Sequence, residues 1–256
     1  MNMYGIVSSV KRDYIADLAR QGKRVDTRML DQFREVSVEG GPIKSAQGSA
    51  RVKIGKTQVL AGVKLEHAEP FSDRPDNGVL IVNAELLPLA SPTFEPGRPG
   101  ENAIELARVV DRGIRESEAI DLEKLVIKSG EDVWAVFIDI YALDHDGNLI
   151  DASALAAIAA LLNAKPPEDE AWTLPEFPIQ KRPVAVTVAK INSKLMIDPC
   201  LDEEGVMDAR ITIATIEDGS ICAVQKGGIG CFSREELEQA YEMARAEGAE
   251  LRAKLG

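Results

Sequence analysis

The chain has 256 residues, 45% hydrophobic and 28% charged, a composition typical of globular proteins that excludes a wholly disordered chain or a fibrous repeat. Lys and Arg number 30 against 42 Asp and Glu, and the net charge of −12 argues against a general nucleic-acid coat protein without excluding a local basic patch. The longest apolar stretch, residues 152–162, is shorter than the about 20 residues of a membrane span, and Lys11, Arg12 and Asp13 interrupt any signal core, so a soluble, cytoplasmic protein is expected.

Residues 9–21 are predicted to form a short amphipathic helix, capped by Ser8 or Ser9 and ended by Gly22. A charged stretch then leads into residues 33–39, whose alternation is typical of a strand. Four apolar side chains are expected on the buried face of the helix: Val10, Tyr14, Ile15 and Leu18.

A hairpin is the clearest local prediction, with strands over 51–54 and 57–63 around a type II′ turn at Gly55-Lys56. Apolar runs predict further strands over 78–87 and 133–143. The spacing of 101–116 predicts a helix with apolar contacts from Ile104, Leu106, Val109, Val110 and Ile114. The remaining segments are predicted as a loop over 88–100, a turn over 144–148 and a buried helix over 152–163.

The second half of the chain follows a proline-rich acidic stretch, residues 164–182, which is the best candidate for a domain boundary. Strands are predicted over 184–191, 194–197, 209–216 and 220–225, and a helix over 234–254 with a capping box at Ser233 and Glu236. Each half places strands before helices, so we expect an α/β fold of the α+β layered kind, with two sheet-plus-helix halves. The expected division is 1–32 as an N-terminal helix and lead-in, 33–164 as domain 1, 165–182 as linker and 183–256 as domain 2.

Two glycine-containing segments resemble nucleotide-binding loops only superficially. Ala50 stands where a Walker loop before Gly55-Lys56 needs glycine, and strands flank the segment. The run 227–230 lacks the final glycine of a dinucleotide fingerprint. With only two histidines, three cysteines and no Cys-x-x-Cys, we expect no metal site and no cofactor, and the cysteines are interpreted as small core residues of a reducing compartment.

Three arginines mark one side of the predicted helix 101–116. Arg108, Arg112 and Arg115 are spaced by four and three residues, so they share a face. One interpretation is structural, because basic residues near the carboxyl end of a helix favour its dipole. The other is a cationic ridge for phosphates, since each guanidinium offers forked donors.

Acidic residues gather in the second half of the chain. Paired carboxylates can hold Mg²⁺ or act as a general acid, whereas the alternative is a solvated loop. No Ser/His/Asp or Cys/His set suggests itself, so no catalytic residue is assigned here. The acidic residues are Asp198, Asp202, Glu203, Glu204 and Asp208.

Taken together, four segments resemble the RNase PH family. The stretch 24–34 is similar to the family's first motif, with Thr27 where glycine is usual, and 47–50 before the hairpin is similar to its second. Residues 102–112 resemble its phosphate-facing helix, and 228–233 resemble the segment before its last helix. The resemblance implies an RNase PH-like fold over nearly the whole chain.

Within the family, the chain resembles the non-catalytic ring subunit of the archaeal exosome. Active relatives place a Gly-Ser/Thr-Arg turn for phosphate before the buried helix, but residues 147–153 contain no arginine, and Asp151 would repel phosphate. Asp208 falls near the position of a catalytic carboxylate. One acid without bound phosphate cannot run phosphorolysis, which depends on holding phosphate in line with the scissile bond.

The resemblance also implies partners. Such a subunit alternates with a catalytic RNase PH-like paralogue in a ring of three heterodimers, with RNA-binding cap subunits on one face and single-stranded RNA in the channel. Arg108, Arg112 and Arg115 are then expected to bind RNA at the active site of the paralogue. Two alternatives stay open: an active phosphate-dependent 3′–5′ exoribonuclease, and a binding module with no RNA role.

Overall fold

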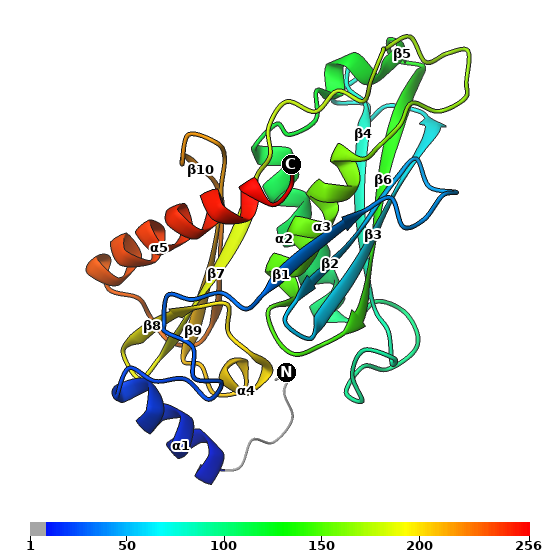
Figure 1. The fold of residues 1–256 in the computed structure, drawn as a ribbon. Helices are drawn as coiled ribbons and strands as arrows, with labels where there is room; N and C mark the ends of the chain where they lie inside the picture. The colour runs from blue at the N-terminus through cyan, green and yellow to red at the C-terminus, as the bar shows by residue number, and fades with distance from the viewer. Residues whose placement is uncertain (1–8) are drawn as a thin grey trace.

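The computed structural model describes residues 9–256, which form two antiparallel-rich sheets and the helices between and beside them (Figure 1). The first sheet has six strands in the order β1-β2-β3-β6-β4, with β5 paired to β6. Its strands are β1 (Val36–Gly40), β2 (Gly48–Ile54), β3 (Thr57–Ala68), β4 (Val79–Leu86), β5 (Val126–Lys128) and β6 (Asp132–Asp144).

The second sheet has four strands in the order β10-β9-β7-β8, all antiparallel neighbours. These strands are β7 (Val184–Ile191), β8 (Lys194–Ile197), β9 (Ala209–Thr215) and β10 (Ile221–Gly228). The helices are α1 (Ser9–Arg20), α2 (Glu101–Glu116), α3 (Leu149–Leu162), α4 (Leu201–Glu204) and α5 (Arg234–Ala253), with a short 3-10 turn, η1 (Leu122–Leu125).

The elements stack in four layers: first sheet, α2 with α3, second sheet, α5 (Figure 1). The middle helices contact both sheets, α3 through β2, β3 and β7 and α2 through β4 and β10. α3 is buried on almost every side because it lies between two apolar sheet faces. The predicted α/β layered fold is confirmed, and one hydrophobic core joins the two halves.

Local signals placed most elements correctly. The β2–β3 turn has a positive φ of +57° at Gly55, as a type II′ turn requires at its first position. Ser233 and Glu236 form the predicted capping box at the start of α5. The buried helix begins at Leu149, three residues earlier than predicted by the Ala- and Leu-rich stretch, so Asp151 and Ser153 are buried within its first two turns.

The predicted burial of some side chains was wrong. In α1, Ile15 and Ala19 are buried, whereas Val10 and Tyr14 are 76% and 59% exposed. The helix rests on Ala189, Ile191, Met196 and Val206 of the second half, and these neighbours choose its inner face. The cap expected at Ser8 lies outside the described residues. In α2, Ile104 is 49% exposed. Of the cysteines, only Cys200 is a core residue, and Cys231 is exposed.

The segment 165–182 has little regular structure but is anchored to the first half. Trp172 packs edge-on against Trp134 of β6, with ring centroids 5.5 Å apart, and stacks with Phe177. Ile179 forms an isolated bridge with Ile120. His67 of β3 contacts Asp132 and also Asp169 of this segment, at 2.9 and 3.4 Å. The segment therefore joins the core of the first sheet.

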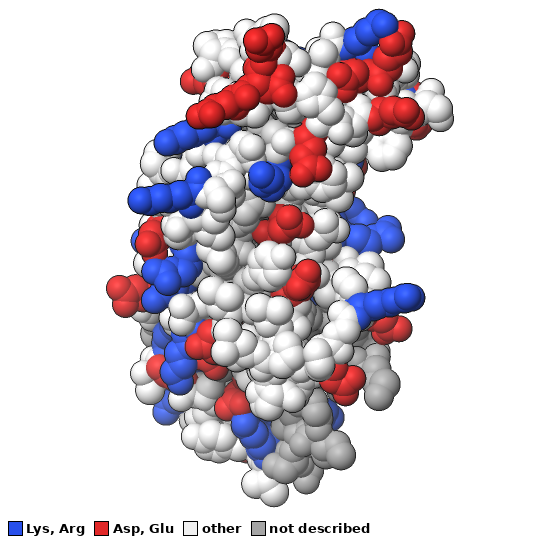
Figure 2. Space-filling view, turned by 90° about the vertical axis from the view of Figure 1, so that its right-hand side faces the viewer, with Lys and Arg blue, Asp and Glu red and all other residues white. Residues whose placement is uncertain are grey.

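The side of the molecule that carries β3, β4 and β6 shows intermixed basic and acidic side chains, with acidic groups gathered toward its upper end (Figure 2). Its middle is mostly uncharged, with a few acidic side chains among the white ones (Figure 2). None of the helices in the described part of the chain has the length and apolarity needed to cross a membrane.

Candidate functional site

The arginine helix α2 is amphipathic, which fixes where its basic side chains go. Leu106, Val110 and Ile114 are buried in the shared core, so the opposite side of the helix faces outward. Arg108, Arg112 and Arg115 lie on that outward side, at neighbouring positions of successive turns. The predicted arginine face therefore exists as a feature of one helix.

The three guanidinium groups differ in their surroundings. Arg108 is exposed and makes no ion pair or hydrogen bond with the residues that the structure describes. Arg112 is half-buried and donates to Gln225 Oε1 of β10 at 3.0 Å. Arg115 pairs with Asp111 at 2.6 Å and donates to the Leu80 carbonyl of β4 at 3.0 Å. The contacts that each guanidinium makes within the protein therefore increase from Arg108 to Arg115.

Two hollows divide the arginine face. Arg108 and Arg112 line an open hollow of ≈ 380 Å³ together with Ile104 and Gln225. Arg115 lines a separate one of ≈ 430 Å³, beside Arg74 and several acidic residues. The structure therefore brings Arg108 and Arg112 together and places Arg115 with a different set of neighbours.

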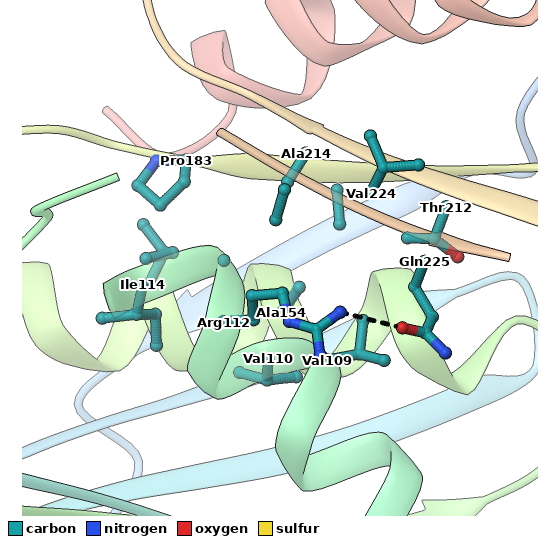
Figure 3. A pocket seen from close by; sticks show the side chains of 14 residues that line it. Val109, Val110, Arg112, Ile114, Ala154, Pro183, Thr212, Ala214, Val224 and Gln225 are labelled. Carbon is teal, nitrogen blue, oxygen red and sulfur yellow. Dashed lines mark hydrogen bonds between the residues drawn. The ribbon is translucent and has the colours of Figure 1, made fainter. Parts of the chain in front are cut away.

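Beneath Arg112, an apolar gap lies between α2, α3 and the second sheet (Figure 3). Gln225 points toward Arg112 across its mouth, and Val224 points away from it (Figure 3). Its volume of ≈ 20 Å³ is close to the room for a single water. We interpret the gap as a packing defect between layers, because a substrate does not fit.

Carboxylate groups of this chain bind the turn that precedes α3. Asn148 has a left-handed φ of +55°, and its backbone N–H donates to Glu204 Oε1 at 2.8 Å. Asp151, in the first turn of α3, accepts from Thr187 N, Thr187 Oγ1 and Asn148 Nδ2 at 2.7–2.8 Å. Burial raises the pKa of Asp151 to about 7, although these hydrogen bonds oppose the shift. The helix amino terminus, which generally favours anions, thus faces acidic groups of the chain.

Neither interpretation of the acidic cluster 198–208 holds for its buried members. The carboxylate of Asp198 has no exposed side-chain surface and pairs with Arg28 and Arg34 at 2.8 and 2.7 Å. Glu203 is equally buried and takes a forked contact from Arg24 at 2.9 and 2.5 Å. These acids are neither solvated nor free to act as a general acid. Within residues 9–256, no group of three or more His, Cys, Asp or Glu has a metal-binding arrangement.

Asp202 and Asp208 are the members of the cluster with exposed side chains, and Asp202 pairs with Lys11. The carboxylate of Asp208 accepts from the backbone N–H of Asn192 at 2.9 Å, and it lines an open groove of ≈ 920 Å³ with Arg12, Arg20 and Glu105. Arg210 of the same groove pairs with Glu105 at 2.8 Å. Acidic and basic side chains therefore share this groove, which is not a dedicated anion site.

Sequence reasoning missed the clamp formed by Arg24, Arg28 and Arg34. The first motif contains these arginines, but their partners Asp198 and Glu203 lie 164–179 residues away along the chain. Thr27 within this motif has a left-handed φ of +67°, which explains why glycine suits this position. The glycine that is usual at this position in the family was the available signal of a left-handed backbone there.

The layered fold, the arginine helix and the terminal capped helix define an RNase PH-like subunit. Residues 32–167 match domain 1 of the 3′ exoribonuclease family, and residues 181–247 match its domain 2. The chain therefore belongs to the 3′ exoribonuclease (RNase PH) family.

Similar proteins support this membership over the full length. The chain is 52% identical to Exosome complex component Rrp42 of Thermococcus kodakarensis, covering 100% of this chain and 97% of the relative. It is 54% identical to the Pyrococcus abyssi protein of the same name, covering 96% and 94%.

Solved structures are also similar. A chain of the Archaeoglobus fulgidus exosome with RNA bound to the active site superposes with a TM-score of 0.93 at 50% identity, covering 96% of this chain and 98% of that one. A chain of an archaeal exosome core superposes at 0.88 with 46% identity, covering 96% of each chain.

Proposed function

We propose that this chain is a non-catalytic ring subunit of an archaeal RNA exosome. It pairs with a catalytic RNase PH-like paralogue, and three such heterodimers close the ring beneath RNA-binding cap subunits. The chain shapes the active site of the paralogue and helps to hold single-stranded RNA for 3′–5′ phosphorolysis. Its similarity to proteins named as exosome components, along their whole length, supports this role.

One observation carries the non-catalytic assignment: acidic groups of the chain itself occupy the turn before α3. Phosphorolysis needs inorganic phosphate held in line with the bond that breaks. Residues 147–153 supply no arginine, and the backbone N–H of Asn148 already donates to the Glu204 carboxylate. A phosphate entering here meets negative charge and lacks a guanidinium partner, so this subunit has no competent site of its own.

The arginine face is proposed as the RNA contact. Arg108 and Arg112 line one open hollow, so both can reach a phosphate that enters it. Arg115 contributes only when its pair with Asp111 opens. Such contacts hold the backbone of the RNA and do not read its bases.

Cytoplasmic location is proposed as well. All three cysteines are free thiols in the structure, which fits a reducing compartment. RNA degradation by a phosphate-dependent complex also requires access to RNA and to inorganic phosphate.

Activity measurements on separated subunits test the proposal. The purified chain is expected to release no nucleoside diphosphates from single-stranded RNA, with or without phosphate. The mixture with the paralogue should release them only when phosphate is added, and the paralogue alone is the control. Nucleoside diphosphates released by this chain, with contaminating paralogue excluded by mass spectrometry, would favour the alternative of an active exoribonuclease.

A further inference from the structure

The segment that joins the two halves of the chain lies as a strap, residues 165–182, over the end of the first sheet where β5 is found (Figure 1). Backbone hydrogen bonds fix both ends of the strap. Lys165 N donates to the Gln47 carbonyl at 2.9 Å, and Gln180 N donates to the Ala119 carbonyl at 2.8 Å. Between these ends the strap contains no helix and no extended strand. Its middle is therefore held mainly by side chains.

Aromatic rings make part of this contact. The Trp172 ring of the strap meets the Trp134 ring of β6 edge-on, with 5.5 Å between centroids. The His67 ring of β3 lies 4.4 Å from the Trp134 ring, also between centroids. Trp134 is 4% exposed, so a large apolar side chain is buried where the strap meets the sheet.

The His67 ring lies between two carboxylates from different elements. Its Nδ1 is 2.9 Å from Asp132 of β6, and its Nε2 is 3.4 Å from Asp169 of the strap. An ionised carboxylate only accepts hydrogen bonds, and a neutral imidazole carries a proton on one nitrogen alone. Both contacts are therefore satisfied only by the imidazolium. When one proton leaves, the shorter contact to Asp132 retains the other, and the contact to Asp169 is lost.

Asp169 and Trp172 belong to one turn of the strap. Ala171 N donates to Asp169 Oδ1 at 2.8 Å, and Trp172 N donates to the Asp169 carbonyl at 3.1 Å. The loss of the contact between His67 and Asp169 therefore frees the same turn that presses Trp172 against Trp134.

The surroundings of His67 favour its charged form. Hydrogen bonding to Asp132 is the main cause that raises the pKa of His67 above its ordinary value, and Asp169 adds to it. Lys128, which lies across from Asp132 in the sheet, pairs with Glu131 instead. The charged residues within two positions of His67, Asp132 and Asp169 are all acidic: Glu66, Glu69, Glu131, Glu168 and Glu170.

We propose that His67, Asp132 and Asp169 form a pH-sensitive clasp, which holds the middle of the strap on the first sheet when the imidazole is protonated and releases it when the imidazole is neutral. Histidine suits this role because its ordinary pKa of about 6.5 lies close to neutral pH. Since the folded pKa is raised, the stability that the clasp contributes is fully present below about pH 6.5 and is lost as pH rises through the folded value. The clasp does not depend on the proposed function.

Intrinsic fluorescence can follow the clasp, because Trp134 and Trp172 are the two tryptophans of the chain. An imidazolium in contact with an indole quenches its emission more strongly than a neutral imidazole does. In a Trp172→Phe chain, the emission of Trp134 should rise with pH along a one-proton titration whose midpoint lies above about 6.5. His67→Gln should abolish this titration. Asp169→Asn should lower its midpoint, whereas the matched control Glu170→Gln should leave the midpoint nearly unchanged.

Movement of the strap needs the other indole. In a Trp134→Phe chain, the emission maximum of Trp172 should shift to longer wavelength over the same pH range, because the strap exposes it to water. Adding His67→Gln should make the spectrum independent of pH. Circular dichroism checks that each variant is folded. Hydrogen exchange over 171–177 in the unmodified chain and in His67→Gln, corrected for the intrinsic effect of pH, gives the same comparison without a tryptophan substitution.

Three outcomes would overturn the clasp and leave the proposed function intact. A titration of Trp134 without any pH-dependent change in Trp172 or in exchange over 171–177 means that His67 titrates without moving the strap. Equal midpoints in the parent and Asp169→Asn mean that Asp169 is not its partner. A pH-dependent shift that persists in His67→Gln assigns the change to another group, such as Asp151 or Glu247, each with a pKa raised by burial to about 7.

Discussion

The arginines of α2 have different costs when removed, because their local partners differ. Arg108 has solvent around it, whereas Arg115 is tied to Asp111 and to the Leu80 carbonyl. Substitution of a residue that contacts RNA should change the affinity for RNA and the salt dependence of that affinity. Substitution of a residue that makes only contacts within the fold should change the free energy of unfolding. These two readouts separate the phosphate-binding and helix-dipole interpretations.

We expect Arg108→Ala and Arg112→Ala to weaken RNA binding by the assembled ring. Each lost phosphate contact should make the slope of log K against log salt shallower by about 0.7 for a single strand. Base sequence should matter little. Fluorescence anisotropy titrations at several salt concentrations measure the slope. Equal slopes for both variants and the parent ring would make the arginine face purely structural.

Arg115→Ala serves as the contrasting variant. It should lower the free energy of unfolding by about 0.5–1 kcal/mol, because a half-exposed i,i+4 pair and one hydrogen bond are lost. The salt slope should change less than for Arg108→Ala. Urea unfolding monitored by circular dichroism gives the stability. A larger loss of RNA affinity than in Arg108→Ala would show that Arg115 is the main contact.

Asp208 tests whether a carboxylate of this subunit takes part in catalysis. It lies in a groove with mixed charges and accepts from the backbone N–H of Asn192, so Asp208→Asn is expected to leave the activity of the assembled ring nearly unchanged. The rate at which the ring releases nucleoside diphosphates under saturating phosphate measures this activity. A loss of about a hundredfold, equal to about 2.7 kcal/mol of barrier, would place a working acid in this subunit.

Asp151 gives a pH dependence of defined sign. Its folded pKa of about 7 lies above the ordinary value of 3.8, so the folded state binds more protons and stability falls as pH rises from about 4 to 7. Replacement by Asn should remove up to one proton from this linkage, flattening the slope by at most about 1.4 kcal/mol per pH unit. Denaturant unfolding at pH 4.5, 5.5 and 6.5 compares the two proteins. Parallel curves would mean that Asp151 titrates normally.

At the scale of elements, the segment between α1 and β1 clamps the two halves. Arg34 donates to both oxygens of Asp198, at 2.9 and 2.7 Å, and to the carbonyls of Asp146 and Gly147. Arg24 and Arg28 bind the same region. Three guanidinium groups, which bind the carboxylates of Asp198 and Glu203, therefore hold together the turn before α3, α4 and the end of β8.

Breaking this clamp should be costly. Arg34→Met leaves the buried Asp198 carboxylate with fewer partners, and we expect a loss of about 3–5 kcal/mol, reduced to the extent that Arg28 compensates. The matched control is Arg51→Met, which breaks the exposed pair with Glu39 and should cost less than about 1 kcal/mol. Thermal and urea unfolding measure both. Similar losses for the two variants would mean that the Arg34 network adds no more than a surface pair.

At the scale of the whole molecule, the four layers explain how a chain with a net negative charge can present a basic surface to RNA. The net charge of −12 is spread over intermixed side chains, and acidic groups gather at one end of the face shown in Figure 2. The outward arginines of α2 lie on a helix that belongs to the shared middle layer, near β10 of the second sheet. A partner on that side meets a locally basic hollow without a basic protein overall.

Local pattern alone was sufficient for most elements of this fold. Helix 101–116 was predicted with its exact bounds, because its apolar spacing and the loop before it are local signals. The β2–β3 hairpin and the cap of α5 were predicted for the same reason. The missing arginine of residues 147–153 was also visible in the sequence, since a motif is contiguous.

What only the tertiary structure decided depends on residues far apart along the chain. The inner face of α1 is chosen by strands near residues 189–206, so Val10 and Tyr14 are exposed despite their apolar character. Asp198 and Glu203 are buried because arginines 164–179 residues away neutralise them. The open edge of β10 follows from strand order, which no local pattern encodes. Periodicity and capping act within a few residues, whereas charge pairing, burial and sheet edges are set by whichever distant segment packs alongside.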